Sequence, residues 1–75
     1  MEIKKRYFIC YELGIHHTTI ETNQKDFFEV VNDLSNEFTI YKFKDDYNHC
    51  IEVYNIQNYY GEMQTVGFVQ DFPCA

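Results

Sequence analysis

The segment between residues 26 and 38 has a periodicity that only an α-helix satisfies. Its apolar side chains recur mainly every three or four residues, which places them on one side of a helix. Its acidic side chains follow the same spacing. Because a helix turns by about 100° per residue, they lie on a second side of the helix, about 120° around the axis from the apolar side chains. The apolar set is Phe27, Val30, Val31, Leu34 and Phe38, and the acidic set, named here the acidic stripe, is Asp26, Glu29, Asp33 and Glu37. The pattern predicts one helix with a buried face and a negatively charged face beside it.

Capping residues set the expected ends of this helix. Asn23 is a favourable N-cap, and Asp26 would then occupy the third helical position, where a carboxylate complements the helix dipole. We expect the helix to end near Asn36, with Asn36 in the left-handed conformation that often terminates helices.

Residues of β-propensity dominate the rest of the chain. The expected strands are residues 3–13, 15–21, 38–44, 49–57 and 63–70. Turns are expected near Gly14, at 45–48 and at 58–62, and Pro73 is expected to close the last ordered segment. The order ββαβββ with hairpin connections favours antiparallel pairing. We therefore predict an α+β fold, a small antiparallel sheet of four to five strands with the helix packed on one face.

The chain has more aromatic surface than a domain of its size can hide. Its 75 residues, treated as a single domain 1–75, bury only about 60% of the unfolded-chain surface. Seven phenylalanines can fill the core, and several of the seven tyrosines are then exposed. Exposed tyrosine is typical of protein interfaces, although it also favours strands through β-propensity alone. We expect a surface for a partner protein or for a homodimer, formed through the uncovered sheet face or a tyrosine-rich edge strand.

The cysteines predict neither a disulfide framework nor a zinc site. Cys10, Cys50 and Cys74 are odd in number and include no CxxC pair, so reduced thiols in a bacterial host cytoplasm are expected. Cys10 and Cys50 lie in apolar runs and should behave as small buried hydrophobes.

The histidines do not form a recognisable catalytic or metal site. His16 and His17 are adjacent, so in a strand their rings point to opposite faces. His49 follows two aspartates, a pattern better explained by a polar hairpin loop than by a metal site. The chain has no GxGxxG, P-loop or HExxH motif. We expect a protein that is not an enzyme and needs no cofactor or metal.

The net charge of −6 argues against direct nucleic-acid binding, because a binder needs a basic patch to neutralise phosphates. The basic cluster Lys4, Lys5 and Arg6 is better explained as protection of an edge strand against aggregation. No run approaches the about 18 apolar residues of a membrane span, and no membrane partner is expected.

The same acidity suits a protein partner that itself binds nucleic acid. The acidic stripe places four carboxylates within about 16 Å at 1.5 Å per residue, where one DNA strand presents about five phosphates at 3.4 Å spacing. We predict that it mimics nucleic acid towards a basic surface on an effector or a toxin. Asp45 and Asp46 are a second acidic group, and Tyr59 and Tyr60 beside Gly61 are candidate aromatic anchors.

In size and acidity the chain resembles small phage-encoded anti-defence proteins, including anti-CRISPR proteins. Gly, Ala, Arg and Pro together number six, whereas Phe, Tyr, Met, Ile, Asn and Lys number 34, which indicates an AT-rich gene of a low-GC bacterium, phage or mobile element. No motif ties the chain to a family. The resemblance implies an inhibitor that occupies the basic surface of a nucleic-acid-processing effector. The alternatives are an immunity protein or antitoxin that neutralises a basic toxin, and a non-catalytic regulatory homo-oligomer.

Overall fold

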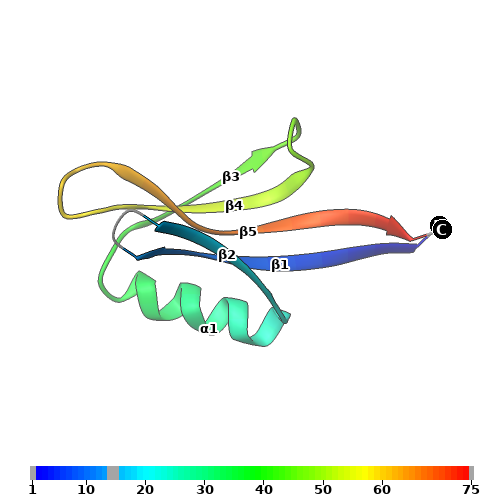
Figure 1. Cartoon of the computed structure of the whole chain (residues 1–75), viewed down its shortest axis with the longest axis horizontal. Helices are drawn as coiled ribbons and strands as arrows, with labels where there is room; N and C mark the ends of the chain where they lie inside the picture. The colour runs from blue at the N-terminus through cyan, green and yellow to red at the C-terminus, as the bar shows by residue number, and fades with distance from the viewer. Residues whose placement is uncertain (1, 14–15, 75) are drawn as a thin grey trace.

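The computed structural model of the chain describes residues 2–13 and 16–74. Within them, five strands and one helix follow one another in the order ββαβββ (Figure 1). The elements are β1 (Glu2–Leu13), β2 (His16–Thr22), α1 (Gln24–Ser35), β3 (Ile40–Asp45), β4 (Cys50–Gln57) and β5 (Met63–Cys74). The α+β class and this element order are as the residue pattern predicts.

The strands form one antiparallel sheet in the order β2-β1-β5-β4-β3. β1 and β5 pair from Glu2↔Cys74 to Ile9↔Gly67, so the two ends of the described chain lie together at one tip of the molecule (Figure 1). The expectation that Pro73 closes the ordered chain is wrong, because β5 continues through Pro73 to Cys74. Beyond Gln70, β5 pairs with β1 but with no other described strand, so this part of β5 is an edge of the sheet. An edge strand tolerates proline, because the missing N–H can fall on the unpaired side.

The helix begins where its cap predicts. The Oδ1 atom of Asn23 accepts a hydrogen bond from the backbone N–H of Asp26 at 2.8 Å. The helix also ends where predicted, with Asn36 as its C-cap, but the predicted left-handed conformation is wrong, because Asn36 has right-handed backbone angles (φ −72°, ψ −23°). The amide of Phe38 donates to the carbonyl of Leu34 at 2.8 Å, so the chain continues in a tight right-handed turn that brings Phe38 back to the core.

Among the described residues, the positive φ values belong to His49 and Gly61, which lie in the β3–β4 and β4–β5 turns. The expected turns at 45–48 and 58–62 are therefore present, the first shifted by one residue to 46–49. The turn expected near Gly14 lies outside the described residues. Among the described residues, no helix is both long and apolar enough to cross a membrane.

The core lies between α1 and one face of the sheet. Phe27 is fully buried, and its ring meets those of Tyr7 and Tyr54 at centroid distances of 5.4 and 5.3 Å. The other apolar helix residues predicted to be buried are half-buried against this cluster; they are Val30, Val31, Leu34 and Phe38. Gly67 permits this contact, because a Cβ there would lie 2.7 Å from Cε2 of Phe27. The glycine that weakens the strand pattern is thus what lets the helix approach the sheet.

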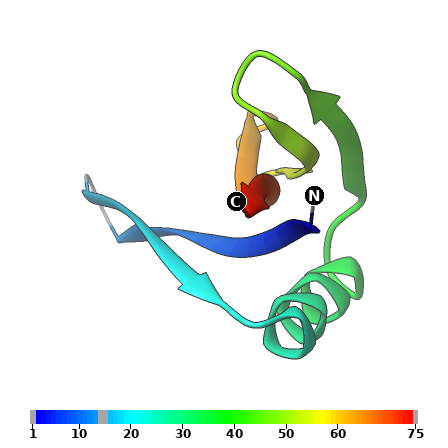
Figure 2. The ribbon, with the colours of Figure 1, turned by 90° about the vertical axis from the view of Figure 1, so that its right-hand side faces the viewer.

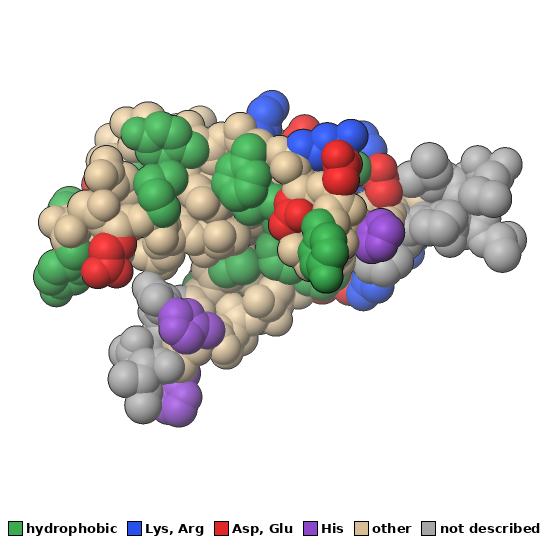
Figure 3. Space-filling model, turned by 90° about the horizontal axis from the view of Figure 1, so that it is seen from above, with side chains coloured by type: hydrophobic (Ala, Val, Ile, Leu, Met, Phe, Trp, Pro, Cys, Tyr) green, Lys and Arg blue, Asp and Glu red, His purple; other side chains and the backbone are tan. Residues whose placement is uncertain are grey.

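The opposite face of the sheet carries an apolar group that consists of phenylalanine and valine rather than tyrosine. Phe8 and Phe68 stack at a centroid distance of 4.9 Å, beside Val53 and Phe43 on the neighbouring strands. Tyr41 is the one tyrosine that the described strands place on this face, so the surplus tyrosines are not a patch on the uncovered sheet. Figure 3, a view from the side away from the helix, shows hydrophobic side chains in separate groups between polar ones.

Candidate protein-binding surface

All four carboxylates of the acidic stripe are exposed on the outer side of α1 and the turn that follows it. Glu37 lies just beyond the last helical residue, Ser35, and continues the stripe past the end of the helix. Since Phe27 anchors the opposite side of α1 in the core, the stripe cannot turn inward without unpacking the helix. The sheet therefore holds the stripe towards solvent in a fixed orientation.

Few groups within the molecule offset the charge of the stripe. Asp26 accepts a hydrogen bond from the side-chain amide of Asn23 at 3.0 Å, and Glu37 accepts one from the hydroxyl of Tyr59. Both donors are neutral. In the described part of the chain, none of the ion pairs involves a stripe carboxylate; the pairs are Arg6–Glu21 and Lys44–Asp46.

The placement of Asp33 is electrostatically unfavourable. It lies in the last turn of α1, which contains no basic residue, so its charge faces the negative end of the helix dipole. Glu29 lies four residues earlier on the same face and adds like-charge repulsion. Asp33 and its repulsion with Glu29 therefore cost stability in the isolated protein, a cost that a cationic partner would relieve.

Tyr59 joins the acidic stripe to the β4–β5 turn. Its ring packs on Phe38 at a centroid distance of 5.1 Å, and its hydroxyl donates to Glu37. Tyr60, the next residue, is 90% exposed. The structure thus brings Tyr59 and Tyr60, two predicted anchor residues, to the C-terminal end of the stripe.

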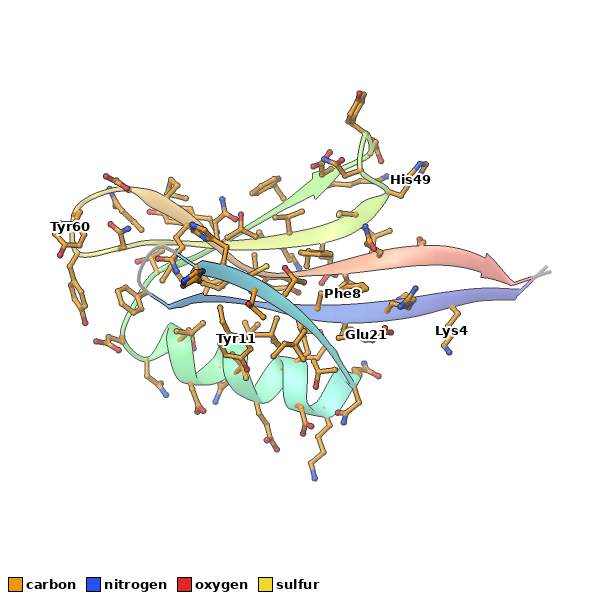
Figure 4. All side chains as sticks on the ribbon, viewed as in Figure 1. Lys4, Phe8, Tyr11, Glu21, His49 and Tyr60 are labelled. Carbon is orange, nitrogen blue, oxygen red and sulfur yellow. The ribbon has the colours of Figure 1, made fainter. Side chains whose placement is uncertain are left out.

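The second predicted acidic group lies elsewhere. Asp45 and Asp46 belong to the β3–β4 hairpin, which projects from the side of the sheet away from α1 (Figures 1 and 2). Asp45 accepts hydrogen bonds from the backbone and side chain of Asn48 at 3.3 and 2.7 Å, and Asp46 pairs with Lys44 at 3.2 Å. Asp45 therefore holds the turn, Asp46 makes only an exposed ion pair, and neither extends the stripe. Figure 4 shows Tyr60 at one end of the molecule and His49 of this turn far from it, on the side of the sheet away from α1.

An apolar cavity beside the stripe was not predictable from the residue pattern. β1 and β5 stop pairing after Ile9↔Gly67, although β1 pairs with β2 as far as Leu13 and β5 pairs with β4 back to Met63. The separation leaves a cavity of about 360 Å³ above the C-terminal half of α1. Its apolar lining comprises Ile9, Tyr11, Val30, Leu34, Phe38, Ile56, Tyr59 and Val66. Phe38 and Tyr59 thus line the cavity, and Tyr59 also contacts the stripe carboxylate Glu37.

The thiols have the character expected of packed hydrophobes. Cys50 is buried, Cys10 is half-buried, and both are free. Burial raises the pKa of each thiol, so neither resembles an activated nucleophile. Cys74 lies at the end of β5, and its side chain is outside the described set.

The described residues show no group of three or more His, Cys, Asp or Glu side chains that could hold a metal ion. His16 and His17 are exposed on β2, and His49 lies in the turn where the polar pattern placed it. The pKa of the Tyr54 hydroxyl is raised by burial and by its hydrogen bond to Glu52, which keeps this core tyrosine protonated.

Comparison of the chain with protein-family models, with curated protein sequences and with solved structures gives no match. The site must therefore be interpreted from its own chemistry, which is an exposed negative face with an apolar cavity at one end.

Proposed function

We propose that the protein is a stoichiometric inhibitor that binds the basic surface of a nucleic-acid-processing protein through its acidic stripe. In this proposal it is an anti-defence protein of the anti-CRISPR kind, encoded by a phage or mobile element. The observation that carries the proposal is the set of four exposed carboxylates, none of which forms an ion pair within the described residues. A basic surface that normally holds phosphates is the complement of such a face.

The apolar cavity supports a binding role, because charge alone gives little affinity. Electrostatic complementarity speeds encounter, whereas buried apolar and aromatic anchors near the centre of an interface supply most of the binding energy. The cavity opens beside Tyr59, whose hydroxyl contacts the stripe carboxylate Glu37. A partner side chain that fills the cavity would anchor the complex while Glu29 and Asp33 meet basic residues around it.

Affinity capture tests this proposal. The native chain is immobilised and exposed to a nuclease-treated bacterial lysate, in parallel with the double variant Glu29→Lys/Asp33→Lys. The matched control is Asp46→Lys/Glu62→Lys, which changes the net charge by the same amount as the stripe variant. Its two carboxylates are exposed and lie in hairpin turns. The native chain and the control should both retain a basic nucleic-acid-binding protein, and the stripe variant should lose it.

Three outcomes would redirect the assignment. Capture of a basic toxin enzyme would favour an immunity protein or antitoxin, and capture of this chain alone would favour a regulatory homo-oligomer. Equal capture by the native chain and the stripe variant would show that the stripe is only a solvated helix face.

A further inference from the structure

The two edges of the sheet differ in how they are protected against pairing with another strand. The edge strand β3 carries Lys42 and Lys44, and its register with β4 is broken between Phe43 and Asp45. Lysines and bulges on an edge prevent the addition of a further strand. The edge strand β2 has neither device. It contains no Lys, Pro or Gly, and it pairs with β1 at seven consecutive positions.

The outer edge of β2 is open. Every residue from His16 to Glu21 is exposed, including Ile20 at 51%. α1 leaves from the end of β2 and packs on β1, β3 and β5, so no described element covers the far side of β2 (Figures 1 and 2). The backbone N–H and C=O groups that point away from β1 are thus available as a template for another strand.

We propose that β2 pairs with β2 of a second copy, antiparallel across a two-fold axis, and joins the two sheets into one. This inference goes beyond the proposed function and does not depend on it. The register that uses all seven residues of β2 is centred on Thr19. It places Thr19 opposite its own counterpart, and it is self-complementary as a two-fold interface requires.

Charge complementarity supports the second copy as the occupant of this edge. In the centred register, His17 lies opposite Glu21 of the other copy, and the two-fold axis repeats this pair. Both side chains point to the face of the sheet that also carries Arg6, whose Nε donates to Glu21 at 2.8 Å. An imidazole N–H can donate to the carboxylate in either protonation state of the histidine. On the opposite face, Ile20 lies across from Thr18, a pairing of β-branched side chains that suits adjacent strands.

The proposed β2–β2 interface differs from the two that composition suggested, which were a tyrosine-rich edge strand and the uncovered sheet face. A tyrosine-rich edge would be β3, which contains Tyr41, and the uncovered sheet face is built from phenylalanine. The lysines of β3 disfavour it as the pairing edge, and β2 contains no Phe, Tyr or Trp. Its capacity to pair therefore comes from an open, regular backbone rather than from aromatic surface.

Sedimentation velocity of the purified full chain, from about 10 to 200 µM, tests the proposal. The native chain should form a dimer in this range. Thr19→Lys should raise the dimer dissociation constant about tenfold or more, because the two new ammonium groups would face each other at the axis. The matched control Thr39→Lys, also at an exposed threonine, should dimerise like the native chain. A native chain that stays monomeric, or a Thr19→Lys variant that dimerises as well as the control, would overturn the proposal.

A charge-swap experiment tests the register itself. His17→Glu alone places two carboxylates opposite each other, and Glu21→Lys alone places an ammonium group opposite an imidazole. Each variant should dimerise more weakly than the native chain. A one-to-one mixture should recover a heterodimer, because the new carboxylate at position 17 then meets the new ammonium at position 21. Circular dichroism establishes that both variants are folded, and failure of the folded mixture to recover the dimer would contradict the centred register.

Discussion

Replacing Asp33 with lysine should stabilise the isolated protein while it weakens binding to a basic partner. Asp33 is exposed in the last turn of α1, where no basic residue is present. A negative charge there costs about 0.3–1 kcal/mol, and the like-charged pair with Glu29 costs about 0.2–0.5 kcal/mol. Asp33→Lys removes both penalties and gives Glu29 an attractive partner four residues on. After screening at an exposed surface, we expect a net gain of about 1 kcal/mol in the free energy of unfolding at low salt.

Urea unfolding and thermal unfolding measure this gain. For a domain of this size, about 1 kcal/mol raises Tm by about 4–8 °C, and the increment should shrink at about 1 M salt. Glu62→Lys is the matched control, with the same charge change in the exposed β4–β5 turn, and it should alter stability by no more than about 0.5 kcal/mol. If Asp33→Lys brings no gain, the stripe carries no electrostatic cost. If Glu62→Lys brings an equal gain, the cost belongs to the net charge rather than to the stripe.

Three further predictions concern the fold. Gly67→Ala should destabilise the protein by about 1–3 kcal/mol in urea unfolding, because the new Cβ would lie 2.7 Å from Cε2 of Phe27; an unchanged midpoint would mean that the ring does not rest on this glycine. Asn23→Ala should cost about 1 kcal/mol and lower the helical signal in circular dichroism, since it removes the acceptor of the Asp26 amide; retention of full stability would show that the cap contributes nothing. Alkylation after denaturation without reductant should modify three thiols, whereas in the native protein Cys50 should react slowly because it is buried and burial raises its pKa; a mass that shows fewer than three modified thiols would indicate a disulfide.

Much of the fold was predictable because local signals agree with the tertiary structure. The 3.6-residue period of the helix identifies the face that is buried, on which Phe27 is fully enclosed. Asn23 marks the start of the helix because its side chain satisfies an amide that the first turn leaves free. The position of the helix end was predicted at Asn36, but its backbone conformation was not. The return of Phe38 to the core, which is a tertiary contact, selects the right-handed continuation.

Residue spacing predicted the charged part of the candidate site, and composition named its tyrosines without their positions. Helical spacing defines the acidic stripe, and the exposure of all four carboxylates agrees with it. The contact of Tyr59 with Glu37 joins residues 22 positions apart, and the cavity arises where β1 and β5 separate, so both depend on strand register. The position of Asp45 and Asp46 relative to the stripe was not predictable, because no local pattern specifies on which side of the sheet the β3–β4 hairpin projects.

The central claim is that the acidic stripe of α1 is the electrostatic part of an epitope. It is tested most directly by the association rate of the purified protein with its captured target, measured by stopped flow across a salt series. The native protein should associate fastest at low salt and slow steeply as salt rises, because exposed charges are screened within about 8–10 Å near physiological ionic strength. Glu29→Lys/Asp33→Lys should associate about tenfold or more slowly at low salt, with little salt dependence. Equal rates for the two proteins at every salt concentration would contradict the account.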